Sequence, residues 1–206
     1  MGHLSRGRRL NTCTLIIGRK GTGKSTKACQ MAQEYVRRNA DKKKRALIVD
    51  VNGAPAYNAL PFFSLRQVAA WKPDAPTRIA KSYLSKADDE DDKALFQGLK
   101  NFRSGLLVFE DCTKYIPGNP GPHVRKFLVD HRMWDVDLVF TFHSLVRVPP
   151  FFWEMTSHVV LCKTQDSRDK LSKRDAIPNL PDMLSAYDRV TRCADPFHAE
   201  LVRTLI

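Results

Sequence analysis

GRKGTGKS, residues 18 to 25, matches the phosphate-binding pattern G-x-x-x-x-G-K-[ST] and decides the fold. The short apolar run Leu15-Ile16-Ile17 precedes it, and a helical pattern from Lys24 to Asn39 follows it. In such a strand–loop–helix unit, the glycines let backbone N–H groups turn toward phosphate oxygens, and the helix N-terminus favours the same anion. A glycine turn before an ordinary helix would predict neither the Lys-Ser pair nor the apolar strand. The sequence therefore predicts a nucleoside-triphosphate site.

The residues of this phosphate-binding loop (P-loop) are expected to have separate roles in binding ATP and Mg²⁺. Lys24 should reach the β- and γ-phosphates, and the Ser25 hydroxyl should ligate Mg²⁺. The remaining loop residues should hold the phosphates largely through their backbone. The predicted nucleotide-binding residues are Gly18, Arg19, Lys20, Gly21, Thr22, Gly23, Lys24, Ser25 and Thr26.

A second apolar strand, Leu106 to Phe109, ends in two adjacent carboxylates, Glu110 and Asp111. This pattern is typical of a Walker-B segment, whose acids emerge at the carboxyl end of the sheet beside the P-loop. We assign Glu110 to Mg²⁺ and Asp111 to polarising the attacking water. The usual order is Asp then Glu, so the division of roles between the two stays open. Two solvated acids at a strand end are the structural alternative.

Length and composition favour one globular domain that spans residues 1–206. Hydrophobic residues make up 43% and charged residues 27% of the chain, which is a globular composition. No apolar run approaches the roughly 20 residues that span a bilayer. The run Leu15 to Ile17 is too short for a signal peptide. These features predict a protein of the cytoplasm or of the inside of a particle.

The net charge of +12 favours a polyanionic partner. Basic residues gather in Arg6 to Arg9, in Arg37-Arg38 with Lys42 to Arg45, and in Lys163 to Arg174, whereas Asp88 to Asp92 is acidic. Any one cluster could be a solvated face, but the total indicates nucleic acid. The five cysteines are an odd number without zinc-site spacing, which indicates reduced, partly buried thiols.

Alternating strand and helix patterns predict a three-layer α/β fold of the P-loop NTPase type (RecA/ASCE-like) with a mainly parallel central sheet. The expected strands are Thr12–Ile17, Ala46–Val51, Leu106–Phe109, Asp137–Phe142 and His158–Cys162. The expected helices are Lys24–Asn39, Asp91–Phe102, Val124–Trp134 and Leu180–Cys193. Asn52–Lys86 should be loops with one or two minor strands, Pro117–Pro122 a turn-rich loop, and Phe197–Leu205 a last edge strand or a hairpin.

Three further segments resemble the HerA/FtsK superfamily of DNA-pumping ATPases. Asp50-Val51-Asn52-Gly53 resembles the Asp-x-x-Gly end of that superfamily's second strand. His131 to Asp137 resembles its arginine-bearing helix end before the sensor strand, and Leu138 to His143 resembles the sensor strand itself. His143 stands where a Gln is usual, which makes its sensor role a departure from the pattern. The resemblance covers most of the chain, from about Thr12 to about Lys163.

Two kinds of superfamily member fit the size of the chain. The zonula-occludens-toxin-like proteins of filamentous phages typically continue into a transmembrane helix and a further domain. The compact genome-packaging ATPases of tailless icosahedral viruses with membranes are the better match. This resemblance implies a homohexameric ring, double-stranded DNA as a sequence-independent partner, a docking partner on the capsid or membrane, and a place in the host cytoplasm or the virion.

The resemblance also implies an arginine finger that a neighbouring subunit supplies to the γ-phosphate. Arg132 is the first choice and Arg147 the second, although Arg132 could equally close a helix C-terminus. The predicted catalytic residues are Lys24, Glu110, Asp111, Arg132 and His143.

Two other functions stay open. A nucleotide or small-molecule kinase would use Asp50 as its acid, and a helper ATPase would recruit partners to DNA without moving it. The adjacent acids Glu110 and Asp111 favour a motor over a kinase, because a kinase must exclude activated water.

Overall fold

A computed structural model describes residues 11–82, 92–114, 116 and 119–204. Within these residues a seven-stranded sheet has the order β3-β2-β4-β5-β1-β6-β7. All neighbouring strands are parallel except β6 and β7, which pair antiparallel. The strands are β1 Cys13–Ile17, β2 Arg45–Val49, β3 Ile79–Ser82, β4 Gly105–Phe109, β5 Val136–Phe142, β6 His158–Cys162 and β7 Ala199–Arg203.

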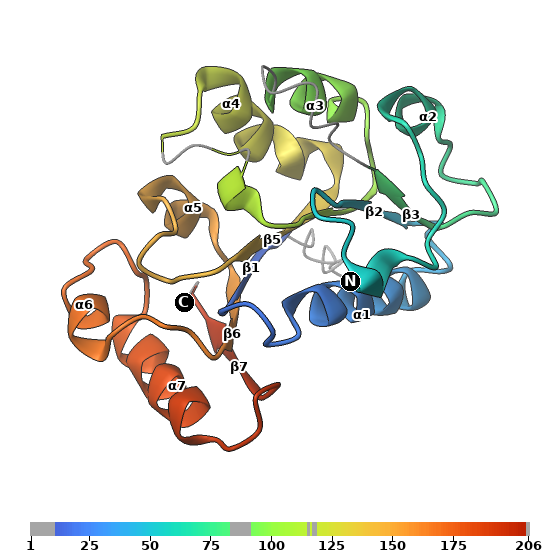
Figure 1. Ribbon diagram of the computed structural model, residues 1–206. Helices are drawn as coiled ribbons and strands as arrows, with labels where there is room; N and C mark the ends of the chain where they lie inside the picture. The colour runs from blue at the N-terminus through green and yellow to red at the C-terminus, as the bar shows by residue number, and fades with distance from the viewer. Residues whose placement is uncertain (1–10, 83–91, 115, 117–118, 205–206) are drawn as a thin grey trace, which may run out of the picture.

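Helices cover both faces of the sheet and give three layers (Figure 1). Helix α1 packs on one face with the short 3₁₀ turn η1, and the second face carries the larger core, to which α2 to α7 contribute. The helices are α1 Lys24–Arg38, α2 Leu65–Ala70, α3 Asp92–Leu99, α4 Pro122–Asp130, α5 Pro150–Met155, α6 Arg168–Ser172 and α7 Leu180–Arg192. The 3₁₀ turns are η1 Pro55–Tyr57, η2 Cys112–Lys114 and η3 His131–Trp134.

The central strands are buried at every position. Each residue of β1, β2, β4 and β5 is buried, which explains their near-continuous hydrophobic sequences, since a parallel sheet covered on both faces has no solvent-facing side. The α/β fold class predicted from the sequence is confirmed. The edge strand β7 is also as predicted for the tail, and its alternate residues are exposed.

Some elements differ from the sequence prediction. The stretch after β2 contains the expected minor strand β3, but it also contains the helix α2, which Ser64 and Gln67 start with a capping box. The predicted helix Val124–Trp134 divides into α4 and η3. Helices α5 and α6 were not predicted, because one short turn has too little periodicity to detect. All five cysteines are free, and Cys193 alone among them is not fully buried.

Several predicted features lie wholly or partly outside the described residues. These are the basic cluster Arg6 to Arg9, positions 83–86 of the stretch Asn52–Lys86, positions 88–91 of the acidic block, positions 117 and 118 of the turn-rich loop, and position 205 of the tail. Among the helices that the structure describes, none is long and apolar enough to cross a membrane.

The strand order decides which side chains meet. Strand β5 lies between β1, which leads into the P-loop, and β4, which leads into the acidic pair. Because these strands are parallel, their carboxyl ends lie at one edge of the sheet. The P-loop, Glu110-Asp111 and His143 therefore come together from segments far apart in the sequence.

Candidate active site

The P-loop is tied to the ends of two strands before it turns into α1. The Gly18 N–H donates a hydrogen bond to the Phe142 carbonyl oxygen over 3.1 Å, and the Arg19 N–H donates to the Lys163 carbonyl oxygen over 2.7 Å. A Cβ on Gly18 would lie only 2.6 Å from the Cβ of Cys162. Only glycine fits at the point where this loop leaves the sheet.

The loop then wraps through two glycines with left-handed backbone. Gly21 has φ +82° and Gly23 has φ +75°, values that other residues reach only with strain. The Thr22 hydroxyl donates to the Arg19 carbonyl oxygen over 2.8 Å and closes the turn. No side chain caps the N-terminus of α1 at Gly23, so its first N–H groups are left for an anion.

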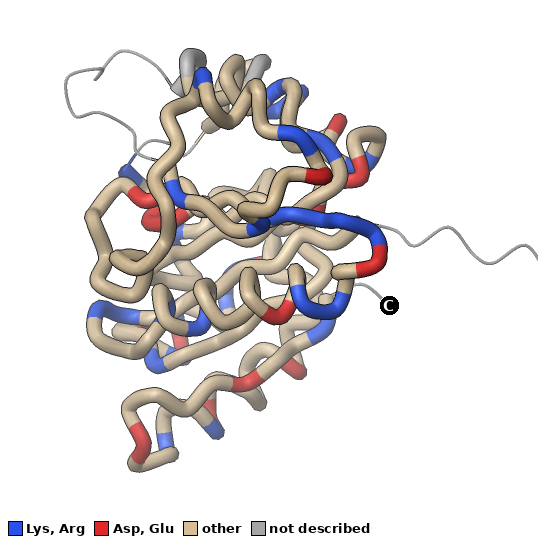
Figure 2. Tube along the Cα trace, turned by 90° about the vertical axis from the view of Figure 1, so that its right-hand side faces the viewer, with Lys and Arg blue, Asp and Glu red and all other residues tan. Residues whose placement is uncertain are grey.

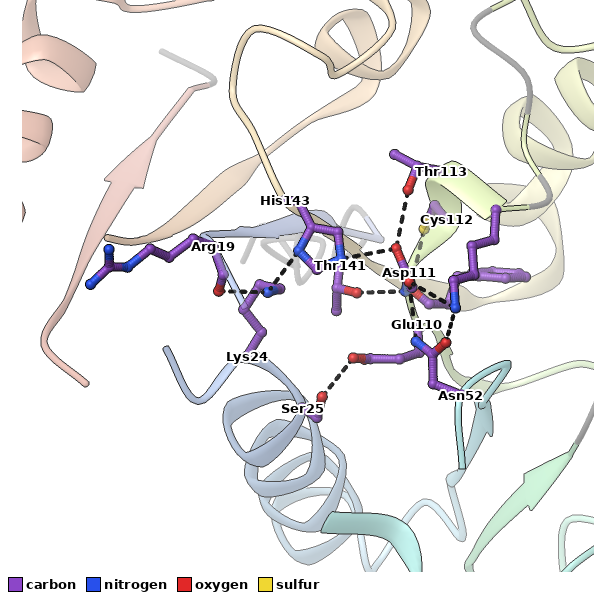
Figure 3. A network of polar contacts seen from close by, with 12 residues as sticks. Arg19, Lys24, Ser25, Asn52, Glu110, Asp111, Cys112, Thr113, Thr141 and His143 are labelled. Atoms are coloured by element: carbon purple, nitrogen blue, oxygen red, sulfur yellow. Dashed lines mark hydrogen bonds and ion pairs between the residues drawn. The ribbon is translucent and has the colours of Figure 1, made fainter. Parts of the chain in front are cut away.

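Lys24 is held at the mouth of the loop. Its Nζ donates to the Arg19 carbonyl oxygen over 3.0 Å and lies 3.3 Å from His143 Nδ1 (Figure 3). The residue is 7% exposed. Burial lowers the pKa of Lys24, an effect that the nearby Glu110 carboxylate opposes. A buried ammonium with few partners attracts an anionic ligand strongly, because little water screens it.

Glu110 uses both carboxylate oxygens. Ser25 Oγ donates to Oε1 over 2.6 Å, and the Tyr57 hydroxyl donates to Oε2 over 2.8 Å. Burial, with the Glu110 charge beside it, raises the pKa of Tyr57, so the phenol stays a donor. The residues fit a Mg²⁺ ion, because Ser25 Oγ and Glu110 Oε1 are adjacent oxygens, the donor type that Mg²⁺ takes in proteins.

Asp111 has a left-handed backbone, with φ +49°. Such a conformation is uncommon outside glycine and costs about 1–3 kcal/mol. Its N–H donates to Thr141 Oγ1 on β5 over 2.7 Å, which holds the turn. In an extended strand, successive side chains point to opposite faces. The turn at Asp111 instead lets the Glu110 and Asp111 carboxylates line one cavity.

The Asp111 carboxylate is fixed by donors from three segments. Asn52 Nδ2 donates to Oδ2 over 3.1 Å, and Thr113 Oγ1 donates to Oδ1 over 3.1 Å. Lys114 Nζ lies 3.5 Å from Oδ2. Burial acts to raise the pKa of Asp111, but the Asn52 hydrogen bond, His143 and the other donors together hold it below its usual range. The group is therefore an ionised carboxylate at neutral pH, able to accept a proton.

His143 connects the P-loop lysine with this carboxylate. Its Nδ1 faces Lys24 Nζ at 3.3 Å, and its Nε2 lies 3.2 Å from Asp111 Oδ1 (Figure 3). An ammonium only donates hydrogen bonds, so Nδ1 accepts and the ring proton resides on Nε2, where it can donate to Asp111. The ring thereby links the phosphate-binding residue to the acid.

Asp50 has a structural role in the loop after β2. It is fully buried, and its oxygens accept hydrogen bonds from the backbone N–H groups of Asn52 and Ala54, each over 3.0 Å. These bonds shape the loop so that the Asn52 side chain reaches Asp111. Asp50 itself does not line the cavity.

The cavity at this edge has a volume of about 640 Å³. Its wall includes Glu110, Asp111 and His143 together with most of the predicted nucleotide-binding residues, which are Lys20, Gly21, Gly23, Lys24, Ser25 and Thr26. The other predicted residues, Gly18, Arg19 and Thr22, brace the loop from behind through the contacts given above. Sequence reasoning thus selected a set of side chains that the fold does bring together.

The two candidate arginine fingers lie at opposite ends of β5. Arg132 is exposed in η3, which precedes β5, so it lies at the edge of the sheet away from its own P-loop. Arg147 is exposed in the loop after His143, at the same edge as the cavity. Neither is part of the cavity wall. That Arg132 or Arg147 acts as the arginine finger in the site of a neighbouring subunit remains a prediction.

Sequence reasoning missed three side chains that organise the acids, Tyr57, Thr141 and Thr113. Thr141 had a signal, since it is the one polar residue in the apolar run Val139 to Phe142. Tyr57 had none, because it lies in a proline-bearing stretch without periodicity, and only the fold shows that its hydroxyl reaches Glu110.

No protein-family model matches the chain, and no curated protein matches it. Among solved structures, the genome packaging NTPase B204 from Sulfolobus turreted icosahedral virus 2, in complex with AMP, has 15% identity and a TM-score of 0.67 over 96% of this chain and 94% of that chain. B204, the DNA-packaging ATPase from Sulfolobus turreted icosahedral virus, has 14% identity and a TM-score of 0.68 over 96% and 94%.

VirB4 of Thermoanaerobacter pseudethanolicus is a further structural neighbour, with 11% identity and a TM-score of 0.57 over 98% of this chain and 92% of that chain. At these identities the neighbours establish the fold. It is the α/β fold with a mainly parallel central sheet that the sequence predicted.

Proposed function

We propose that this chain is an ATP-hydrolysing motor that moves double-stranded DNA, as in viral genome packaging, and that it acts as a ring. The observation that carries the proposal is the convergence of Lys24, Ser25, Glu110, Asp111 and His143 on one cavity of about 640 Å³ behind the P-loop. A phosphate cradle next to a held, ionised carboxylate is the arrangement that hydrolysis of a nucleoside triphosphate requires.

Each residue has a role in this proposal. The P-loop N–H groups and Lys24 bind the phosphates, and Lys24 gives up its contacts with Arg19 and His143 to do so. Ser25 and Glu110 would hold Mg²⁺, which supplies positive charge beside the phosphate oxygens when bound. Asp111 orients the attacking water and accepts its proton. His143, no longer in contact with Lys24, has the sensor role and detects whether the γ-phosphate is present.

The structure gives no support to the kinase alternative. A kinase of this kind would need Asp50 as an acid facing its substrates, whereas both Asp50 oxygens accept backbone hydrogen bonds inside the loop. The two acids at the end of β4, Glu110 and Asp111, line the cavity instead. This arrangement favours hydrolysis over transfer to a second substrate.

The DNA and ring parts of the proposal rest on charge and on the structural neighbours. The net charge is +12, and the B204 neighbours are described as genome-packaging or DNA-packaging enzymes. A ring of identical subunits is built from heterologous contacts, so a finger must lie on a different surface from the P-loop. Arg132, exposed at the opposite edge of the sheet, meets that condition. The host cytoplasm or the virion, with a capsid or membrane docking partner, is the place where such a motor would act.

The test is ATP hydrolysis by the full chain with and without double-stranded DNA, together with the mass of the assembly. A motor should hydrolyse ATP faster on DNA and should assemble into a ring when nucleotide is bound. Hydrolysis that DNA leaves unchanged, in a protein that stays monomeric, would favour the helper-ATPase alternative. An absence of hydrolysis under every condition would reject the ATPase itself.

A further inference from the structure

Phe197 is an exposed aromatic residue that lies directly against the P-loop. Its side chain comes from the loop between α7 and β7, and 56% of it is exposed. A methyl group placed on Gly23 would lie 3.2 Å from Cδ1 of the ring and 3.9 Å from Cε1. The ring therefore reaches the point where the P-loop becomes α1.

The loop that carries Phe197 is held in place by polar contacts. The Phe197 N–H donates to Asp195 Oδ1 over 2.8 Å, and the His198 N–H donates to the Asp195 carbonyl oxygen over 3.3 Å. Lys27 in the first turns of α1 donates from Nζ to the Phe197 carbonyl oxygen over 2.7 Å. These bonds fix the backbone on both sides of the ring, whereas the ring itself stays largely open to solvent.

The direction in which a bound nucleotide extends follows from the sheet order. Lys24, Asp111 and His143 place the γ-phosphate toward β4 and β5, on one side of β1. Strands β6 and β7 lie on the other side of β1. A nucleotide whose γ-phosphate faces Asp111 therefore has its nucleoside on the β6–β7 side, beyond the first turn of α1. Phe197 is an exposed aromatic of the loop that leads into β7, and β7 lies on that side of β1 (Figure 1).

We infer that Phe197 stacks on the adenine base of the bound nucleotide. This inference rests on the proposed nucleotide site and adds the residue that binds the base. A phenyl face suits any base, since all bases present a π-face, and such stacking contributes to affinity without hydrogen-bond readout. The absence of a side chain on Gly23 leaves room for the ring to approach the loop. The hydrogen bond from Lys27 Nζ to the Phe197 carbonyl oxygen holds the loop that carries the ring against α1.

The experiment compares two ligands that share the phosphates and differ in the base. Binding of ATP and of inorganic tripolyphosphate, each with Mg²⁺, is measured by calorimetry for the full-length wild type and for Phe197→Ala, Phe197→Trp and Leu201→Ala. Leu201 is the matched control, an exposed apolar residue of the adjoining strand β7 with 63% exposure. Phe197→Ala should weaken ATP binding about tenfold and leave tripolyphosphate binding unchanged. Phe197→Trp should restore ATP affinity, and its indole emission should be quenched by ATP and not by tripolyphosphate.

Three results would overturn the inference, and they differ in kind. Wild-type ATP affinity in Phe197→Ala, with tripolyphosphate bound normally, rejects the base platform and leaves the phosphate site intact. Failure of the wild type to bind either ligand rejects the phosphate site and the platform together. Equal losses of ATP and tripolyphosphate affinity in Phe197→Ala also reject base stacking, because they show that the ring supports the P-loop instead.

Discussion

Ser25 Oγ donates a hydrogen bond to Glu110 Oε1 over 2.6 Å. The bond joins the first turn of α1 to the end of β4 and closes the cavity floor. A divalent ion that takes both oxygens as ligands must displace the hydroxyl proton from between them, because that proton would face the cation. With Mg²⁺ bound, the two side chains would therefore have to give up this hydrogen bond, whereas Asp111 next to them is held independently by Asn52 and Thr113.

We predict that Asp111→Asn stops hydrolysis and keeps nucleotide binding. The amide cannot accept a proton, so the loss of the general base should lower kcat by about 10²–10⁴-fold. Ser25 and Glu110 are untouched, so the ATP–Mg²⁺ affinity should stay near that of the wild type. Thr113→Ala is the matched control, since it removes one hydrogen bond to the same carboxylate and no reactive group. Normal turnover in Asp111→Asn would show that this carboxylate is not the base.

Glu110→Gln should shift the Mg²⁺ dependence of hydrolysis to higher concentrations. A neutral amide is a weaker ligand than a carboxylate, and its single oxygen replaces the two oxygens to which Ser25 and Tyr57 donate in Glu110. A Mg²⁺ titration of ATPase activity at saturating ATP checks this. If Glu110→Gln traps bound ATP and Asp111→Asn alters the metal dependence, the roles of the two acids are exchanged, as the usual Asp-Glu order would suggest.

Lys24→Ala should lower kcat/KM for ATP by at least about 10²-fold, because it removes the charge that meets the β- and γ-phosphates. Its side chain contacts Arg19 and His143 and not the apolar core, so the thermal midpoint of unfolding should change little. ATPase assays and thermal melts on the same preparation test both parts. Wild-type turnover in Lys24→Ala would contradict the P-loop assignment.

The sequence predicted the parts of this site that depend on local pattern. Local pattern was enough to predict the P-loop, the strand before Glu110 and the central strands, because glycine spacing and hydrophobic runs involve nearby residues alone. The Tyr57 contact with Glu110 and the Phe197 contact with Lys27 of α1 join residues 53 and 170 positions apart. No local pattern predicts such pairs, because the strand order that creates them is a property of the whole sheet.

His143→Gln should keep most of the activity, whereas His143→Ala should lower kcat by about 10- to 100-fold. The His143 ring faces Lys24 through Nδ1 and Asp111 through Nε2, and a glutamine amide offers one acceptor and one donor for the same two partners. Glutamine is also the residue that the resembled superfamily usually has there. Equal activity of the alanine and glutamine variants would show that the link between Lys24 and Asp111 has no role in turnover.

Asp111 should also make the stability of the fold depend on acid pH. Its pKa is lower in the folded protein than its ordinary value of 3.8, so its contribution is fully present above that value and is lost as the pH falls through the folded pKa. Below about pH 4, the wild type should therefore lose thermal stability more steeply than Asp111→Asn does. Parallel loss of the melting midpoint in both proteins between pH 5 and pH 3 would contradict this expectation.

Arg132 is predicted to act in the site of a neighbouring subunit. Arg132→Ala should bind ATP normally and hydrolyse it about 10³-fold or more slowly. Mixing it with Lys24→Ala should restore part of the activity, since a mixed ring pairs an intact P-loop with a neighbour's intact Arg132. Mixed rings without any rescue would exclude Arg132, and the same complementation would then be run with Arg147, which lies at the cavity edge of the sheet.

The last prediction concerns which basic residues bind double-stranded DNA. An unbroken run of basic residues, Lys42 to Arg45, leads into β2 and forms the long blue stretch of the tube in Figure 2. Within it, Lys42 and Lys43 are exposed, whereas Lys44 is 7% exposed and pairs with Asp135 over 2.8 Å. Lys44 therefore supports the fold, and replacing all three lysines together would confuse stability with binding.

The basic cluster Lys163 to Arg174 is partly neutralised by acids within it and in α7. Arg168 pairs with Asp188 over 3.0 Å, and Lys173 pairs with Asp169 over 2.9 Å. In the part of the chain that the structure describes, the side chains of Lys163 and Lys170 form no such pair. The most informative variants are thus two double changes, Lys42→Ala with Lys43→Ala, and Lys163→Ala with Lys170→Ala.

Duplex binding should be independent of sequence and should weaken steeply with salt. Each phosphate contact adds about −0.9 to the slope of log affinity against log salt, because contact releases condensed counterions. Fluorescence anisotropy across a salt series, with an ATP analogue present, should show a shallower slope in whichever double variant removes contacts. Lys42 and Lys43 lie at the amino edge of the sheet, away from the ATP cavity, so we expect the Lys163–Lys170 pair to carry the larger change. No detectable duplex binding by the wild type at low salt would reject the DNA motor while leaving the ATPase site untouched.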